Sequence, residues 1–249
     1  MGFGFSENNA LPAIYIDVLR KHAFGRHDVN IRWQGDLSAI LENRGVLPLP
    51  PYIKHTPKYL DNERYQTVYS RMDKAGSIAA PTAGLHFTED MRNLIKKEFA
   101  WVEVTLHVGY GTFNPVRDED IRRHHMHGEF VEITAQTVQA VLNARQDGRP
   151  ILAVGTTTAR ALEGMANACG GDFTEISNRG WSGWTDIFIY PGYKFQIVDA
   201  MLTNFHLPKS SLLMLVSALA GRDAVLAAYR HAVIKLYRFF SYGDAMLIA

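Results

Sequence analysis

Three apolar runs along the chain each reach a histidine that is set among small and polar residues. The histidines are His86, His107 and His206. A strand that ends in Gly, Thr, Asn or Pro presents its last side chains at an open end, and in parallel α/β proteins ligands bind at that end. A single histidine is more often a hydrogen-bonded structural residue, but three in the same setting predict one site built from several strand ends.

The remaining apolar pattern alternates between the periods of strands and of helices. Strands are predicted at residues 101–108, 129–133, 151–154, 186–190, 198–203 and 245–248. Helices are predicted from residue 88 and at 134–145, 156–168, 210–219 and 223–239, with a loop at 170–183. This repeated order of strand and then helix predicts an α/β fold, in which outer helices surround a barrel-like, mostly parallel sheet.

Residues 1–45 differ from the rest of the chain. Their predicted elements are strands at 13–19 and 29–33 and a helix at 36–43. This is too little apolar material for an independent core. The proline-rich segment 47–52 then excludes a helix and holds the chain extended. We therefore expect residues 1–45 to depend on residues 46–249 for their stability.

Composition narrows the class of protein. The 249 residues are 47% hydrophobic and 20% charged, which is typical of a soluble globular chain. A formal net charge of +1 predicts no strong non-specific attraction to nucleic acid or to an anionic membrane. Cys169 is the single cysteine, so no intrachain disulfide is possible. With no apolar run of membrane-spanning length and no signal-peptide pattern, we expect a cytoplasmic protein without a membrane partner.

Three polar segments outside the histidine runs are further candidates. Segment 154–160 joins a strand to a helix, and its backbone amides and threonine hydroxyls can hold a carboxylate or phosphate, although helix capping by threonine explains it equally well. Segment 209–211 (KSS) can likewise bind an anion or simply cap a helix. Segment 237–246 (YRFFSYGDAM) can stack on a purine or form a core cluster at a helix end.

A group of neighbouring histidines raises the question of a metal site. Its members are His124, His125 and His127. Arg122 and Arg123 repel a cation, and no thiolate ligand is near, so no metal is predicted. A polar pair of His127 and Glu129 that serves a substrate explains the segment better, and a metal-dependent hydrolase stays an open alternative.

Long segments of the chain resemble one known family. They are LPLPPYI (47–53), ERYQTVYS (63–70), APTAGLHF (80–87), VTLHVGYGTFNPV (104–116), MHGE (126–129), AVGTTTARALE (153–163), DIFIYPG (186–192), TNFHLP (203–208) and YRFFSYGDAM (237–246). In this order they are similar to the S-adenosylmethionine:tRNA ribosyltransferase-isomerases of queuosine biosynthesis. The resemblance covers nearly everything from Leu47 to the end.

The resemblance implies an activity that composition does not show. S-adenosylmethionine acts as a ribosyl donor, and the ribosyl unit is moved and isomerised onto 7-aminomethyl-7-deazaguanine in tRNA. The products are epoxyqueuosine-tRNA, adenine and methionine. The implied partners are S-adenosylmethionine and the precursor tRNA. S-adenosylmethionine acts as a co-substrate, and no other cofactor is expected. A monomer is favoured. A proton beside the sulfonium is removed, adenine leaves and the amine of the base attacks, which requires a general base, a hydrogen-bond donor and a carboxylate anchor.

The resemblance also suggests roles for individual residues. His86, His107 and His206 are the candidates for proton transfer, and Thr156, Thr157 and Arg160 for anchoring the methionine carboxylate. Tyr242 and Asp244 are candidates for contact with adenine or with a flipped base. The other substrate-binding candidates in the matching motifs are Thr82, Gly84, Thr112, His127, Glu129 and Asn204.

Family members open with a longer segment that precedes a small β domain. The resemblance therefore implies that residues 1–45 are a shortened piece of that domain and that residues 46–249 are the α/β catalytic domain. Activity is expected to be reduced by the shortening. A non-catalytic remnant that acts at most as a binding module stays open as the alternative function.

Overall fold

The computed structural model describes residues 2–4, 14–22, 27–50, 52–53, 55–77, 79–109, 120–121, 124 and 126–249. Contacts divide the chain into two compact units, Met1–Pro57 and Lys58–Ala249. The catalytic and small-domain roles expected for 46–249 and 1–45 stay predictions.

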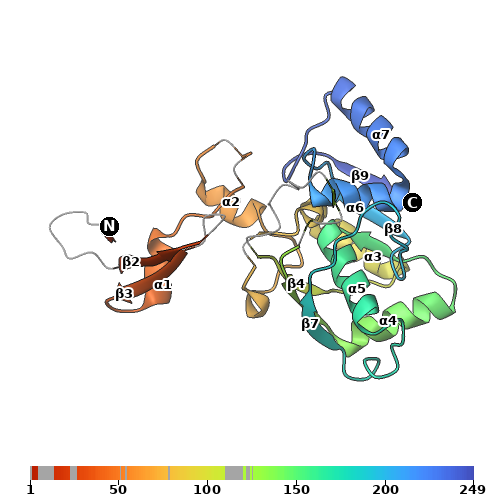
Figure 1. The fold of residues 1–249 in the computed structure, drawn as a ribbon, viewed down its shortest axis with the longest axis horizontal. Helices are drawn as coiled ribbons and strands as arrows, with labels where there is room; N and C mark the ends of the chain where they lie inside the picture. The colour runs from red at the N-terminus through yellow and green to blue at the C-terminus, as the bar shows by residue number, and fades with distance from the viewer. Residues whose placement is uncertain are drawn as a thin grey trace. The chain divides into compact units, whose positions relative to one another are not determined.

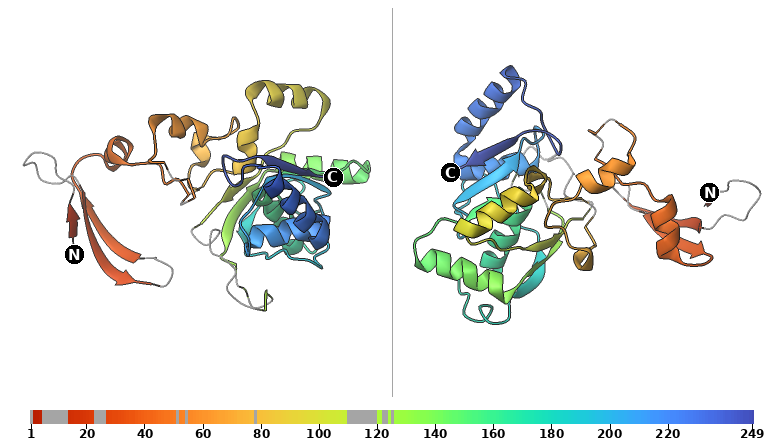
Figure 2. Two further views of the ribbon diagram at one scale, coloured as in Figure 1. Left: turned by 90° about the horizontal axis from the view of Figure 1, so that it is seen from above. Right: turned by 180° about the vertical axis from the view of Figure 1, so that it is seen from behind.

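The first unit is a small antiparallel sheet followed by one helix. Its elements are β1 (Gly2–Gly4), β2 (Ile14–Lys21), β3 (His27–Trp33) and α1 (Leu37–Arg44). The strands lie in the order β1-β2-β3, and the β2–β3 pair is visible in Figure 2. The Asp36 carboxylate caps α1 by accepting a hydrogen bond from the Ser38 amide at 2.9 Å. No residue of β2, β3 or α1 is buried, which agrees with the small apolar content of this part of the sequence.

The second unit alternates strands and helices (Figure 1). Its elements are α2 (Tyr59–Arg64), η2 (Met72–Lys74), η3 (Thr82–His86), α3 (Glu89–Glu98), β4 (Thr105–His107), β5 (Glu129–Ile133), α4 (Ala135–Gln146), β6 (Leu152–Val154), α5 (Thr156–Ala168), β7 (Trp181–Thr185), β8 (Ala200–Asn204), α6 (Ser211–Ala220), α7 (Arg222–Ile234) and β9 (Ala245–Ile248). Hydroxyl groups start three of the helices, because Thr88, Thr134 and Ser210 each accept a backbone N–H bond of 3.2 Å from the first turn.

The predicted α/β class is confirmed, but the described strands do not form the mostly parallel, barrel-like sheet. They form two separate sheets in this unit, ordered β4-β5-β7 and β6-β8-β9. Among the described strands only β6 and β8 pair in parallel, and no barrel closes. The reason is that β5, β6, β7 and β8 enter the two sheets alternately. The helices between them therefore do not wind one continuous sheet.

Helix α5 joins the two sheets into one core. It contacts β6 and β8 of one sheet and β4 and β7 of the other. Ala159, Met165 and Ala166 on this helix are fully buried, as is Val131 on β5. A Cβ at Gly164 would overlap the Thr185 side chain, so the absence of a side chain there lets α5 lie directly on β7. This packing fixes the position of the first turn of α5, where candidate residues lie.

Strand β7 and helix α7 depart most from the boundaries that the sequence pattern predicts. Strand β7 occupies 181–185, inside the predicted loop, whereas 186–190 has no strand ladder. The Trp181 indole lies over Gly183, and β5 supplies the hydrogen-bonding partner that a local pattern cannot reveal. Helix α7 ends at Ile234 rather than 239, because Leu236 adopts a left-handed conformation with φ 59°.

Helices α6 and α7 meet at Gly221. Within the described residues no single helix has the length and apolar character needed to cross a membrane. The two helices satisfy that criterion only as a pair, and they are bent by 115° at their junction.

Candidate active site

The carboxyl ends of the parallel strands β6 and β8 meet two other segments. Gly155, between β6 and α5, has φ 89° and donates its backbone N–H to the Leu202 carbonyl at 2.8 Å. A Cβ built on Gly155 would lie 3.5 Å from the Ala83 Cβ, so η3 passes close to the start of α5. Ala245 of β9 pairs with Asn204, the last residue of β8. The strand ends, η3 and the start of α5 therefore lie together.

His86 is held at this place by a short hydrogen-bonded chain. The Thr82 hydroxyl donates to the Asn204 Oδ1 at 3.1 Å, and the Asn204 Nδ2 donates to the His86 Nε2 at 2.9 Å. An accepting Nε2 implies a neutral ring with its proton on Nδ1. Burial lowers the pKa of His86, and this outweighs the nearby Asp244 carboxylate, which favours the charged form. His86 therefore presents a neutral N–H donor at pH 7.

Asp244 is an ionised carboxylate beside this histidine. It immediately precedes β9 and accepts hydrogen bonds from the Arg238 backbone N at 2.7 Å and from its Nη2 at 2.8 Å. These bonds from Arg238 hold the pKa of Asp244 below its usual value. His86, Asn204 and Asp244 therefore combine a neutral donor, an amide and a fixed negative charge at one end of the β6-β8-β9 sheet.

His206 follows β8 by two residues and is bound mainly to its own surroundings. Its backbone N–H donates to the Tyr229 hydroxyl at 2.9 Å, and its Nε2 lies 2.8 Å from the Thr203 hydroxyl. Desolvation by the surrounding protein lowers the pKa of His206 to about 4, although part of the side chain reaches the surface. The ring is neutral at pH 7, and its role in proton transfer stays a prediction.

His107 has its contacts in the other sheet. Its Nε2 lies 3.6 Å from the Glu132 carboxylate, which also forms an ion pair with Lys74. Its ring stacks on Phe130, with 6.2 Å between centroids. His86 and His206 thus lie at the end of β8, whereas the described contacts of His107 are with the outer face of the β4-β5-β7 sheet.

A buried ion pair stands at the start of α5. Glu129, on β5, and Arg160, on α5, are 2% and 3% exposed, and the Arg160 Nη1 donates to the Glu129 carboxylate. Within the described residues the Arg160 Nε and Nη2 have no hydrogen-bond partner. Thr156 is also buried, and Thr157 is half-buried. The pair therefore leaves two buried donors without an acceptor.

Two of the predicted substrate-binding residues, Gly84 and Tyr242, contact neighbouring protein side chains in this structure. A Cβ at Gly84 would overlap the Tyr69 hydroxyl, so Gly84 permits the close approach of that ring. The Tyr242 hydroxyl donates to the Asp61 carboxylate at 3.1 Å. Burial, together with Asp61, raises the pKa of Tyr242 to about 12. Tyr242 thus ties the C-terminal segment to α2.

Some predicted positions cannot be placed in this geometry. Thr112 and His125 lie outside the described residues. His127 is described and lies just before β5, and the His124 ring contacts the Phe188 ring at 5.1 Å. Among the residues that the structure describes, no group of three or more His, Cys, Asp or Glu side chains is arranged to bind a metal.

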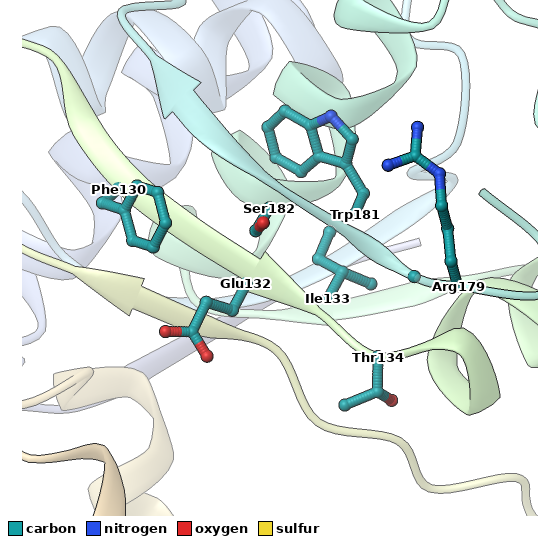
Figure 3. Close-up of a pocket in the computed structure, with 8 residues that line it drawn as sticks. Phe130, Glu132, Ile133, Thr134, Arg179, Trp181 and Ser182 are labelled. Carbon is teal, nitrogen blue, oxygen red and sulfur yellow. The ribbon is translucent and has the colours of Figure 1, made fainter. Parts of the chain in front are cut away.

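An open hollow of about 420 Å³ lies beside β5 and β7 (Figure 3). Phe130 and Glu132 line it from β5, and Thr134 lines it from the start of α4. Arg179 and Trp181 line it from β7 and the residues before it. None of the predicted site residues lines this hollow. Glu132 connects it to His107, so it belongs to the outer face of that sheet.

Sequence reasoning missed the importance of Glu163. This carboxylate is fully buried and accepts four hydrogen bonds of 2.9 Å, from the Tyr193 hydroxyl and the backbone amides of Gln196, Ile197 and Val198. It fixes the segment that leads into β8. The available signal was a single acid among apolar neighbours on one face of α5, since Ala159, Leu162 and Ala166 share that face.

Comparisons with known proteins all match this chain to one family. A family model described as queuosine biosynthesis protein matches residues 5–248. The S-adenosylmethionine:tRNA ribosyltransferase-isomerase of Nitratidesulfovibrio vulgaris is 56% identical over 94% of this chain, and that of Oleidesulfovibrio alaskensis is 57% identical over 94%. A crystal structure of S-adenosylmethionine tRNA ribosyltransferase from Thermotoga maritima is 33% identical, with a TM-score of 0.53 over 95% of this chain and 62% of that one.

The chain spans about three fifths of the length of the two relatives, 62% and 60% respectively. The family model nevertheless matches almost every position of the chain, including the segments that build the ends of β6 and β8. The chain belongs to the family of queuosine biosynthesis proteins.

Proposed function

We propose that this chain carries the S-adenosylmethionine:tRNA ribosyltransferase-isomerase activity for which its relatives are named. The observation that supports this most strongly is the identity of 56% over 94% of the chain. In the proposed reaction the ribosyl unit of S-adenosylmethionine is transferred to 7-aminomethyl-7-deazaguanine in tRNA and isomerised. Epoxyqueuosine-tRNA forms, and adenine and methionine are released.

His86 is the proposed hydrogen-bond donor to the leaving adenine. Its neutral ring carries the proton on Nδ1 while Asn204 holds Nε2 at 2.9 Å. A donor that is already oriented stabilises negative charge as it develops on a leaving group, because it needs no reorganisation during the reaction. Asp244, kept ionised by Arg238, is the proposed acceptor for a proton or for a polar group of the base.

S-adenosylmethionine is a co-substrate in this proposal, and no other cofactor takes part. The second partner is a tRNA that carries the precursor base, which must leave its stack for its amine to reach the opened sugar. Because tRNA is the substrate, the proposed place of action is the cytoplasm. His206, His127 and Thr157 stay candidates around this centre.

The test is incubation of the purified chain with S-adenosylmethionine and precursor tRNA. The proposal expects adenine and methionine in equal amounts and in proportion to modified tRNA. Release of S-adenosylhomocysteine would contradict it, because that product marks methyl transfer. Tight binding of both substrates without adenine release would instead support a binding module.

A further inference from the structure

Arg160 is a buried cation, and within the described residues two of its three side-chain nitrogen atoms have no hydrogen-bond partner. The side chain is only 4% exposed, and its Nη1 is occupied by Glu129. The Nε and Nη2 atoms have no acceptor within the described residues. A buried donor without a partner costs about 1–3 kcal/mol, and more when the group is charged. A fold that retains two such donors side by side is therefore suited to a ligand that supplies their acceptors.

The two unused donors define the shape of that ligand. The Nε–H and the outer Nη2–H project from the same edge of the planar guanidinium group. Two parallel N–H donors match the two oxygens of one carboxylate, which is the bidentate arrangement that arginine forms most strongly. Glu129 holds the opposite side of the guanidinium through Nη1. Glu129 is thus a positioning residue that leaves one edge available.

The position of Arg160 near the N-terminus of α5 favours an anion. Arg160 follows Thr156 by four residues on α5, so the two side chains share a helix face, and a helical side chain leans toward the N-terminus of its helix. The first amides of α5 have no acceptor within the helix and carry the positive end of its dipole. Gly155, one residue earlier, lies against Ala83 of η3, the segment that also carries His86.

We infer that the Nε–Nη2 edge of Arg160 binds the α-carboxylate of an amino-acid-type ligand. This inference rests on the proposed function, under which that ligand is the methionine part of S-adenosylmethionine. A small ligand that ends in a carboxylate suits this edge better than an RNA phosphate, because Arg160 is only 3% exposed and a polynucleotide backbone is too bulky to reach it.

The experiment compares two ligands that differ only in this carboxylate. Binding of S-adenosylmethionine and of its decarboxylated analogue to the full chain is measured by calorimetry. The wild-type chain is expected to prefer S-adenosylmethionine roughly 10- to 100-fold, as for hydrogen bonds to charged groups. Arg160→Lys keeps the charge but removes the fork, so the preference should fall to within about threefold. His231→Gln, at an exposed histidine of α7, is the control and should keep the full preference.

Each outcome decides the inference. Equal binding of the two ligands by the wild-type chain overturns the Arg160 anchor while the proposed function stands. Binding of neither ligand overturns both. An Arg160→Lys chain that is folded, as judged by its melting curve, and that keeps the full preference also overturns the anchor. If Arg160→Lys does not fold, Glu129→Gln is measured instead. It is expected to weaken S-adenosylmethionine binding more than binding of the analogue, and an equal effect on both counts against the inference.

Discussion

Helix α5 carries two buried charges that differ in how completely the protein satisfies them. Glu163 accepts four hydrogen bonds from the segment around residues 193–198, so its carboxylate is fully used within the fold. Arg160, one turn earlier, donates from one nitrogen to Glu129, and its other two nitrogens have no partner among the residues that the structure describes. Both side chains are buried, and burial alone does not distinguish them.

We interpret this difference as one between a group that stabilises the fold and a group that is suited to bind a ligand. A buried charge whose hydrogen bonds are complete stabilises the arrangement around it. A buried charge with unused donors is destabilising until something else supplies the acceptors. The same comparison applies to the two histidines that lie near the end of β8. His206 is hydrogen-bonded to Thr203 and, through its backbone, to Tyr229. His86 is bound to Asn204 through Nε2, and its Nδ1–H points away from that partner.

The largest effect is expected on stability, from a change at Glu163. Glu163→Ala removes the acceptor of four donors, three of which are backbone amides, and should lower the free energy of unfolding by about 3–5 kcal/mol. Urea denaturation measures this change. Glu175→Ala is the control, because that side chain is 87% exposed, and it should change stability by less than about 0.5 kcal/mol. Similar values for the two variants would show that Glu163 is not a structural acid.

The next largest effect is expected on the rate of adenine release, from a change at His86. His86→Gln removes the proposed donor to adenine and should reduce the rate of adenine release roughly 100- to 1,000-fold. Its melting temperature should change little, since Gln can still contact Asn204. The exposed His231→Gln serves again as the control and should keep full activity. A folded His86→Gln chain with unchanged turnover would remove His86 from the site.

The smallest effect concerns pH and His206. The pKa of His206 is about 4 in the folded chain and about 6.5 when the ring is exposed. Between these values the unfolded state binds a proton and the folded state does not. Stability is unaffected above pH 6.5 and is lost as the pH falls toward 4, by about 2 kcal/mol at pH 5. Denaturation at pH 7 and at pH 5 should show this loss in the wild type and a smaller one in His206→Asn. An identical pH dependence in both proteins would contradict the buried neutral ring.

Local signals in the sequence predicted the helix starts well. Thr88, Thr134 and Ser210 each cap a helix as their residue types suggest, because an N-cap depends on neighbours only three residues away. The strand ends of β6 and β8 and their polar residues were also visible as apolar runs that stop at Gly155 and Asn204.

Long-range pairing could not be predicted in the same way. The Glu163 carboxylate accepts hydrogen bonds from the backbone amides of Ile197 and Val198, which lie 34 and 35 residues away in the sequence. Successive strands are divided between two sheets, and His107 therefore has its contacts in the β4-β5-β7 sheet and not at the end of β8. Neither feature has a local pattern, because each depends on which distant segments share a core.

The most direct test of the account follows the atoms of S-adenosylmethionine into tRNA. The chain is incubated with precursor tRNA and with S-adenosylmethionine that is labelled either in the ribose or in the methyl group. If the chain transfers the ribosyl unit, ribose label enters the tRNA in amounts equal to the adenine released, while the methyl label stays in free methionine. Methyl label in the tRNA, or adenine release without ribose transfer, would contradict the account.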